Sequence, residues 1–145
     1  MLKMKIKKLR PVKTPNRGTE ASAGIDFYVP EDFETAVLKP GQSALIPSGI
    51  KAQVPRGYAL IAFNKSGVSV KQGLSVGACV VDEDYEGEIH LHMINTSDKD
   101  QTIVTGQKLV QFVLIPVGYL DVVEVDELKS RNTERGAGGF GSTGL

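Results

Sequence analysis

The residues best suited to chemistry in this chain of 145 follow a short apolar run. The run Ala78 to Val81 is too short for a helix and too apolar for a loop, and it stops abruptly at Asp82. Residues 83–87 then supply turn chemistry, and a second candidate strand, Glu88 to Asn95, leaves the turn. The pattern predicts a β-hairpin whose rim carries Asp82 and the aromatic Tyr85.

Two interpretations of this acidic turn stay open. Asp82 and Asp84 alternate along one segment and could serve as general base and hydrogen-bond acceptor. An arbitrary acidic turn is more often only a solvated turn, because acidic side chains are rarely buried. Spacing alone does not choose between a catalytic role and turn formation.

A second group that could meet an anion follows the apolar run Tyr58 to Phe63. Lys65, Ser66 and Gly67 offer an ammonium, a hydroxyl and flexible backbone N–H groups, which together can bind phosphate oxygens. The same residues can also form an ordinary turn. Gln111 lies farther along in a long, mostly apolar run, where the plain interpretation is a polar position that faces solvent.

Asp26 is an unusual residue for its place in the chain. It lies among Ile25, Phe27 and Val29, so its carboxylate needs partners if this predicted strand is buried. The alternative is an acid at a strand edge that faces water.

The C-terminal segment, residues 132–145, is rich in glycine and is predicted to be disordered when free. It is not a P-loop, because no lysine follows the glycines. An inert terminus is the default interpretation. Phe140, alone among glycines, instead suggests a segment that orders over a ligand and stacks on a base. Arg135, Ser142 and Thr143 would then bind phosphate.

The rest of the chain consists of elements that could position these groups, and its apolar residues recur with strand-like periods. Proline and glycine turns separate the runs, which predicts an all-β sandwich or barrel in one domain, residues 1–145, with one helical turn near Ser66 to Gln72. The predicted strands are Lys5 to Leu9, Ile25 to Val29, Ser43 to Ile46, Gly49 to Val54, Tyr58 to Phe63, Leu74 to Val81, Glu88 to Asn95, Gln101 to Val104, Lys108 to Val117 and Leu120 to Val125.

Composition excludes several classes of function. Seventeen basic residues balance seventeen acidic ones, which argues against a stable nucleic-acid partner. The start, Met1 to Lys5, lacks the long apolar segment of a signal peptide or membrane span, so a cytoplasmic protein is expected, or a nuclear one in a eukaryotic host. Cys79 is interpreted as a buried small hydrophobe. His90 and His92 share a strand face without a third metal ligand at suitable spacing, so they are interpreted as packing or surface residues.

Five segments, taken together, resemble the signature motifs of the homotrimeric dUTP diphosphatases (dUTPases). Gly77 to Gly87, Gly-Ala-x-Val-Val-Asp-Glu-Asp-Tyr-x-Gly, is similar to the third motif. The others follow the family order: Ala21 to Asp26 resembles the first, Lys65 to Val68 the second, Gly106 to Gln111 the fourth and Arg135 to Gly144 the fifth. The family usually has an arginine where this chain has Lys65.

The resemblance implies a jelly-roll-like β-sandwich or distorted barrel, assembled as a homotrimer with sites between subunits. It implies hydrolysis of dUTP to dUMP and pyrophosphate by attack of water on the α-phosphorus, with Asp82 as the base. This activity would keep uracil out of DNA and supply dUMP for dTMP synthesis. Mg²⁺ would be held by the triphosphate and water rather than by protein ligands.

The resemblance also implies a role for each candidate site residue. The backbone of Val80 and Val81, with the strand near His90, would read uracil, and the Tyr85 ring would exclude a 2′-hydroxyl. Gln111 would reach the α-phosphate region, and Asp26 would support the site. The remaining substrate-binding candidates are Lys65, Ser66, Gly67, Arg135, Phe140, Gly141, Ser142 and Thr143, the last five in the mobile segment that would cover the site. The alternatives are a dCTP deaminase-like enzyme and a non-catalytic nucleotide-binding β module.

Overall fold

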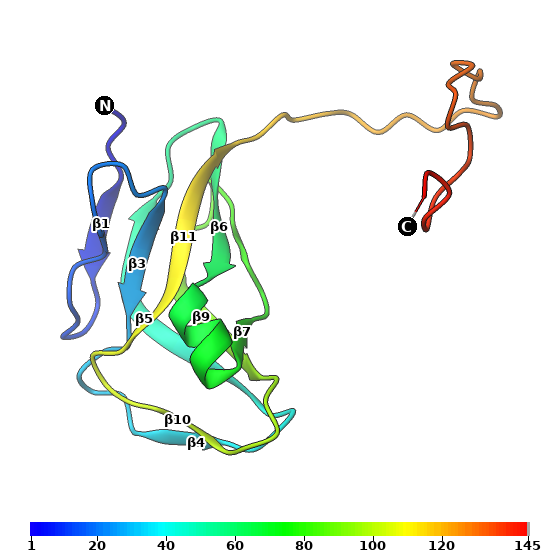
Figure 1. The fold of residues 1–145 in the computed structure, drawn as a ribbon. Coiled ribbons are helices and arrows are strands. Elements are labelled where there is room, and N and C mark those ends of the chain that lie inside the picture. Colours follow the sequence, from blue (N-terminus) through cyan, green and yellow to red (C-terminus); the bar gives the residue numbers. More distant parts are fainter. Residues whose placement is uncertain (145) are drawn as a thin grey trace.

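The computed structural model describes residues 1–144, which form an almost entirely β structure (Figure 1). A π-helical turn, η1 (Val68–Gln72), lies within the predicted helical turn. The strands are β1 (Lys5–Lys8), β2 (Asn16–Arg17), β3 (Gly24–Tyr28), β4 (Ala36–Leu38), β5 (Ser43–Gln53), β6 (Tyr58–Asn64), β7 (Leu74–Val76), β8 (Val80–Val81), β9 (Glu88–Asn95), β10 (Gln101–Ile103) and β11 (Lys108–Pro116).

The strands form two main sheets and one small sheet. One main sheet has the order β1-β5-β9-β7, the other has the order β2-β3-β11-β6-β8, and β10 pairs with β4. Alternate side chains of both sheets are buried in one core, where the Phe27 and Phe112 rings lie 4.7 Å apart between centroids. The predicted all-β, jelly-roll-like sandwich is therefore confirmed, without a closed barrel.

Strand β5 is continuous where the sequence predicted two strands separated by Pro47. The register with β9 shifts between Pro47 and Lys51, so a bulge absorbs the proline without ending the strand. Gly49 adopts a φ of 75° within this bulge, a backbone conformation that favours glycine.

The predicted strand Leu74 to Val81 is wrong as a single element. β7 pairs with β9 in one sheet, whereas β8 pairs with β6 in the other. Residues 77–79 cross between the sheets, because a strand cannot serve both sheets in one straight run.

The predicted hairpin is also wrong, although its turn lies where expected. Val81 pairs with Leu60 of β6, and β9 pairs with β5 and β7 rather than with β8. The turn at residues 82–87 therefore connects the two main sheets at the rim of the sandwich.

The C-terminal part of the chain leaves the sandwich after β11 and runs away from it (Figure 1). Residues 120–125 were predicted to be a strand, but they pair with no other strand among residues 1–144. A strand needs a neighbour for its backbone groups, and this segment has none among the described residues. Among the described residues, no helix is long and apolar enough to cross a membrane.

Candidate active site

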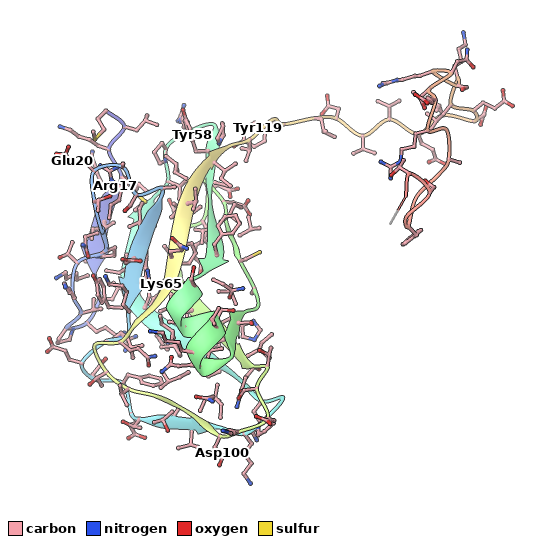
Figure 2. The ribbon with its side chains drawn as sticks, viewed as in Figure 1. Arg17, Glu20, Tyr58, Lys65, Asp100 and Tyr119 are labelled. Atoms are coloured by element: carbon pink, nitrogen blue, oxygen red, sulfur yellow. The ribbon has the colours of Figure 1, made fainter. Side chains whose placement is uncertain are left out.

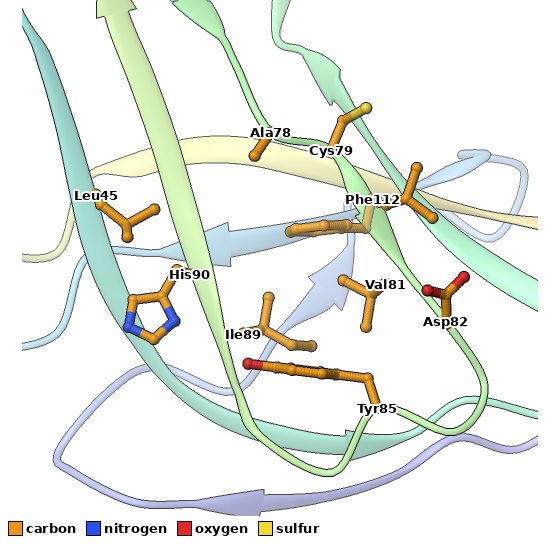
Figure 3. A pocket seen from close by; sticks show the side chains of 10 residues that line it. Leu45, Ala78, Cys79, Val81, Asp82, Tyr85, Ile89, His90 and Phe112 are labelled. Atoms are coloured by element: carbon orange, nitrogen blue, oxygen red, sulfur yellow. The ribbon is translucent and has the colours of Figure 1, made fainter.

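A cavity of about 260 Å³ opens beside β8 and the turn that follows it (Figure 3). Asp82 is exposed at its edge, and the interior is mostly apolar. Such a pocket suits a flat, weakly polar ring with an acid beside it. Its lining residues are Leu45, Ala78, Cys79, Val80, Val81, Asp82, Tyr85, Ile89, His90 and Phe112.

Tyr85 forms one side of this cavity, with its ring near Val81 and Ile89 (Figure 3). Its hydroxyl donates a hydrogen bond of 2.8 Å to the carbonyl oxygen of Glu88. A Cβ atom at Gly87 would lie 2.4 Å from that hydroxyl oxygen, so the ring can take this position only because residue 87 is glycine. The turn therefore fixes both the aromatic wall and Asp82.

The opposite wall depends on His92, which sequence reasoning assigned to packing or the surface. The backbone N–H of Ala78 donates to His92 Nδ1 at 2.8 Å, and a Cβ atom at Gly77 would lie 2.1 Å from the same nitrogen. Because Nδ1 accepts this bond, the ring carries its proton on Nε2. His92 holds the crossing segment in place, while the predicted site residue His90 lines the cavity itself.

Asp26 belongs to a second cluster on the five-stranded sheet. It is only 5% exposed and forms ion pairs with Lys65 and Lys108, the latter at 3.2 Å. The hydrogen bond that Lys108 donates to the Asp26 carboxylate raises the pKa of Lys108. Asp26 is therefore a buried, paired acid rather than an edge acid facing water. Lys108 was not singled out from the sequence, although it lies within the fourth motif.

Gln111 lies next to Asp26 in the register of β11 and β3. Its Nε2 donates to the carbonyl oxygen of Asn64 at 2.8 Å, immediately before Lys65. A Cβ atom at Gly24 would lie 2.1 Å from Gln111 Oε1, so glycine is required there. The structure brings Gln111, Asp26 and Lys65 together (Figure 2 labels Lys65). Ser66 and Gly67 follow as exposed helical residues that lead into η1.

The two clusters are well separated within one chain. Val81 pairs with Leu60, and the chain extends along β6 from Leu60 to Lys65, which spans about 17 Å at the usual rise per strand residue. A group that activates water at phosphorus must be within hydrogen-bond reach of it, directly or through one water. Asp82 and Lys65 of the same chain are too far apart to act on one phosphate.

The C-terminal candidates form a third group, away from both clusters (Figure 1). Arg135 donates through Nε to the carbonyl oxygen of Gly138 at 2.8 Å, and Phe140 is fully exposed. Ser142, Thr143 and Gly141, which has a φ of 90°, are exposed as well. The last residue of the predicted segment, Leu145, lies outside the described residues.

Comparisons with known proteins agree with the order of the motifs and with the geometry of the site. A family model for dUTPase matches residues 10–144. The chain belongs to the dUTPase family. A deoxyuridine 5′-triphosphate nucleotidohydrolase of Hydrogenobaculum sp. (strain Y04AAS1) is 37% identical, over 99% of both chains. Its namesake in Candida albicans is 40% identical over 91% of this chain and 81% of that protein.

Solved dUTPase structures have the same fold. A variant of the Staphylococcus bacteriophage 80alpha dUTPase, solved with dUpNHpp, superposes with a TM-score of 0.88 over 100% of both chains, at 25% identity. Another variant of that phage dUTPase superposes with a TM-score of 0.84, at 26% identity, over 97% of this chain and 98% of that chain. The similarity to the first dUTPase thus includes the C-terminal extension.

Proposed function

We propose that this dUTPase hydrolyses dUTP to dUMP and pyrophosphate by attack of water on the α-phosphorus, with Asp82 as the general base. The observation that carries the proposal is the position of Asp82, exposed at the edge of an apolar, ring-sized cavity. A carboxylate there can accept the proton of a water molecule while the nucleobase is held inside. The activity keeps uracil out of DNA and supplies dUMP for dTMP synthesis.

The cavity supplies base and sugar recognition. The backbone of Val80 and Val81, with the strand at His90, reads the edge of uracil, and a rigid set of donors and acceptors rejects cytosine. The Tyr85 ring is held in place by the hydrogen bond from its hydroxyl to the Glu88 carbonyl oxygen and by contact with Gly87, so it stays against the sugar. Its ring therefore leaves no room for a 2′-hydroxyl, which favours dUTP over UTP.

The second cluster binds the phosphates. Lys65 and Ser66 supply an ammonium and a hydroxyl, the backbone at Gly67 supplies N–H groups, and Gln111 reaches the α-phosphate region. Asp26 orients Lys65 through their ion pair. Mg²⁺, held by the triphosphate and water, neutralises phosphate charge when bound. This fits the residues present, because lysines pair with both oxygens of Asp26.

The active form is a homotrimer in which each site combines residues of different copies. The separation of Asp82 from Lys65 along one chain supports this, because two copies can bring the groups together where one cannot. Apolar side chains on the same sheet also need a cover: Phe63 is 44% exposed and Val80 58% exposed. A cyclic assembly provides it without leaving an open edge.

Residues 132–145 form a mobile cover over the site within a single-domain chain, residues 1–145. The direction of the extension, away from its own sandwich, favours a site on another copy (Figure 1). There Phe140 stacks on the base, and Arg135, Ser142 and Thr143 bind phosphate beside Gly141. Covering the site excludes bulk water from the reaction. The cytoplasm, or the nucleus in a eukaryotic host, is the proposed compartment.

The test is pyrophosphate release by the full chain with dUTP and Mg²⁺. We expect release from dUTP, much less from UTP, and no ammonia from dCTP. Ammonia from dCTP would support a deaminase instead, and nucleotide binding without turnover would support a non-catalytic module. Family membership favours neither alternative.

A further inference from the structure

A second cavity lies beside the acidic turn, next to the pocket that contains Asp82. Its volume is about 420 Å³, and it is bounded by β6, by the turn and by the first residues of the C-terminal extension. Asp82, Glu83 and Asp84 line it from the turn, and residues 117–119 line it from the extension. Asp82 and the first residues of the C-terminal extension therefore line the same cavity.

Within the acidic turn, Glu83 is hydrogen-bonded to a residue outside the turn. The backbone N–H of Gly57 donates to Glu83 Oε2, and the carbonyl oxygen of Gly57 accepts from the N–H of Val117 at 2.9 Å. Gly57 has a φ of 80°, a conformation that favours glycine. Gly57, in the turn between β5 and β6, is thus hydrogen-bonded both to the acidic turn and to Val117 at the start of the extension.

Tyr119, in the extension, lines the same cavity as Glu83. Two hydrogen bonds lower the pKa of Glu83: the larger effect comes from the backbone N–H of Gly57 and the smaller from the Tyr119 hydroxyl. The hydrogen bond to the Glu83 carboxylate raises the pKa of Tyr119. Glu83 is therefore ionised and Tyr119 protonated at neutral pH, so the hydroxyl can donate to the carboxylate across the cavity.

We propose that Glu83 is a positioning residue for Asp82 and that it couples the acidic turn to the C-terminal extension through Tyr119. Because it accepts a hydrogen bond from the N–H of Gly57, the Glu83 carboxylate holds the backbone beside Asp82 in place. The proposal rests on the proposed function, with Asp82 as the base. It adds that one contact, between Glu83 and Tyr119, sets two things. These are the direction in which the extension leaves the sandwich and the position of the Asp82 carboxylate.

The test compares Glu83→Ala, Glu83→Gln, Tyr119→Phe and the double variant Glu83→Ala with Tyr119→Phe in the full chain. Glu83→Ala should lower kcat about tenfold or more, because small misplacements of a base are costly, and leave KM within about twofold. Glu83→Gln keeps an acceptor for the Gly57 N–H and should recover most of the rate. Tyr119→Phe should lower kcat severalfold, and the double variant should be no slower than Glu83→Ala alone.

Glu86→Ala is the matched control, because it removes an exposed carboxylate from the same turn. It should leave kcat and KM unchanged. Binding of dUpNHpp and the unfolding temperature should stay near wild type in every variant that retains the fold. If Glu83→Ala fails to fold, Tyr119→Phe alone decides by its kcat.

Two outcomes separate this inference from the proposed function. If wild type hydrolyses dUTP and Asp82→Asn does not, while Glu83→Ala and Tyr119→Phe both match wild type, the positioning role is overturned and the function stands. If wild type releases no pyrophosphate from dUTP, the proposed function fails first. Rates that multiply in the double variant would overturn the coupling through Tyr119.

Discussion

The sandwich and the C-terminal extension contain similar side chains in opposite environments. In the sandwich, Ile46 and Leu91 are at most 1% exposed, whereas Leu120 is 78% and Val122 90% exposed in the extension. Both regions show the apolar pattern of a strand, but among residues 1–144 only the first has strand partners. This difference supports the proposal that the sandwich supplies the chemistry and that the extension contacts another copy.

The largest expected effect tests the sandwich as the source of chemistry. Asp82→Asn should lower kcat by about a hundredfold or more, because the amide keeps the shape but cannot accept a proton. Binding of dUpNHpp should persist, as measured by calorimetry. Asp98→Asn, an exposed acid in the β9–β10 connection, is the control and should match wild type. Near-normal turnover by folded Asp82→Asn would remove the base from this pocket.

The next effect tests the extension as a cover without a structural role. Ending the chain at Arg131 should leave the enzyme nearly inactive, with kcat/KM lowered well beyond about tenfold, since base stacking and phosphate contacts are both lost. The unfolding temperature should stay close to that of the full chain, because residues 132–144 do not pack on the core. A large fall in unfolding temperature would make the segment structural instead.

A pair of apolar truncations contrasts the two environments directly. Leu91→Ala should lower the free energy of unfolding by about 2–5 kcal/mol at every protein concentration, because it leaves a cavity in the core. Leu120→Ala should act only through assembly, so its effect on unfolding and on sedimentation should grow as the protein is diluted. Equal, concentration-independent losses in both variants would contradict the contrast.

The smallest effect concerns selectivity, which the sandwich should hold without the extension. Tyr85→Ala should narrow the preference for dUTP over UTP severalfold, because the ring no longer blocks the 2′-hydroxyl. The chain ending at Arg131 should keep the wild-type ratio of kcat/KM for the two nucleotides, although both values fall. Unchanged discrimination in Tyr85→Ala would assign the task to another group.

The sequence was sufficient to predict the sandwich and the neighbourhood of several candidate residues, whose roles stay predictions, because strand alternation and motif order are local signals. Asp82 and Tyr85 lie at the predicted rim, and Asp26 has the partners that a buried acid requires. The hairpin prediction failed because β8 is only two residues long and its pairing depends on which sheet it joins. Chain order alone does not decide that choice.

The supporting contacts could not be predicted for the same reason. His92 meets Ala78 across 14 positions, and Lys108 meets Asp26 through strand register. Glu83 meets Tyr119 across a cavity between distant segments. No local sequence pattern predicts these pairs. One of them, His92 with Ala78, has a neighbouring sign in the sequence, because a Cβ atom at Gly77 would clash with the His92 ring.

The central claim is that the base and the cover of one site come from different copies, and mixed trimers test it most directly. Asp82→Asn with an intact extension and the chain ending at Arg131 with an intact Asp82 should each be nearly inactive alone. Co-expressed in equal amounts, they should regain activity at about a quarter of the sites, because each site draws its base and its cover independently in a cyclic assembly. Mass spectrometry establishes that mixed trimers are present, and dUTP hydrolysis measures recovery. Mixed trimers without recovered activity would place both groups on one chain and contradict the shared site.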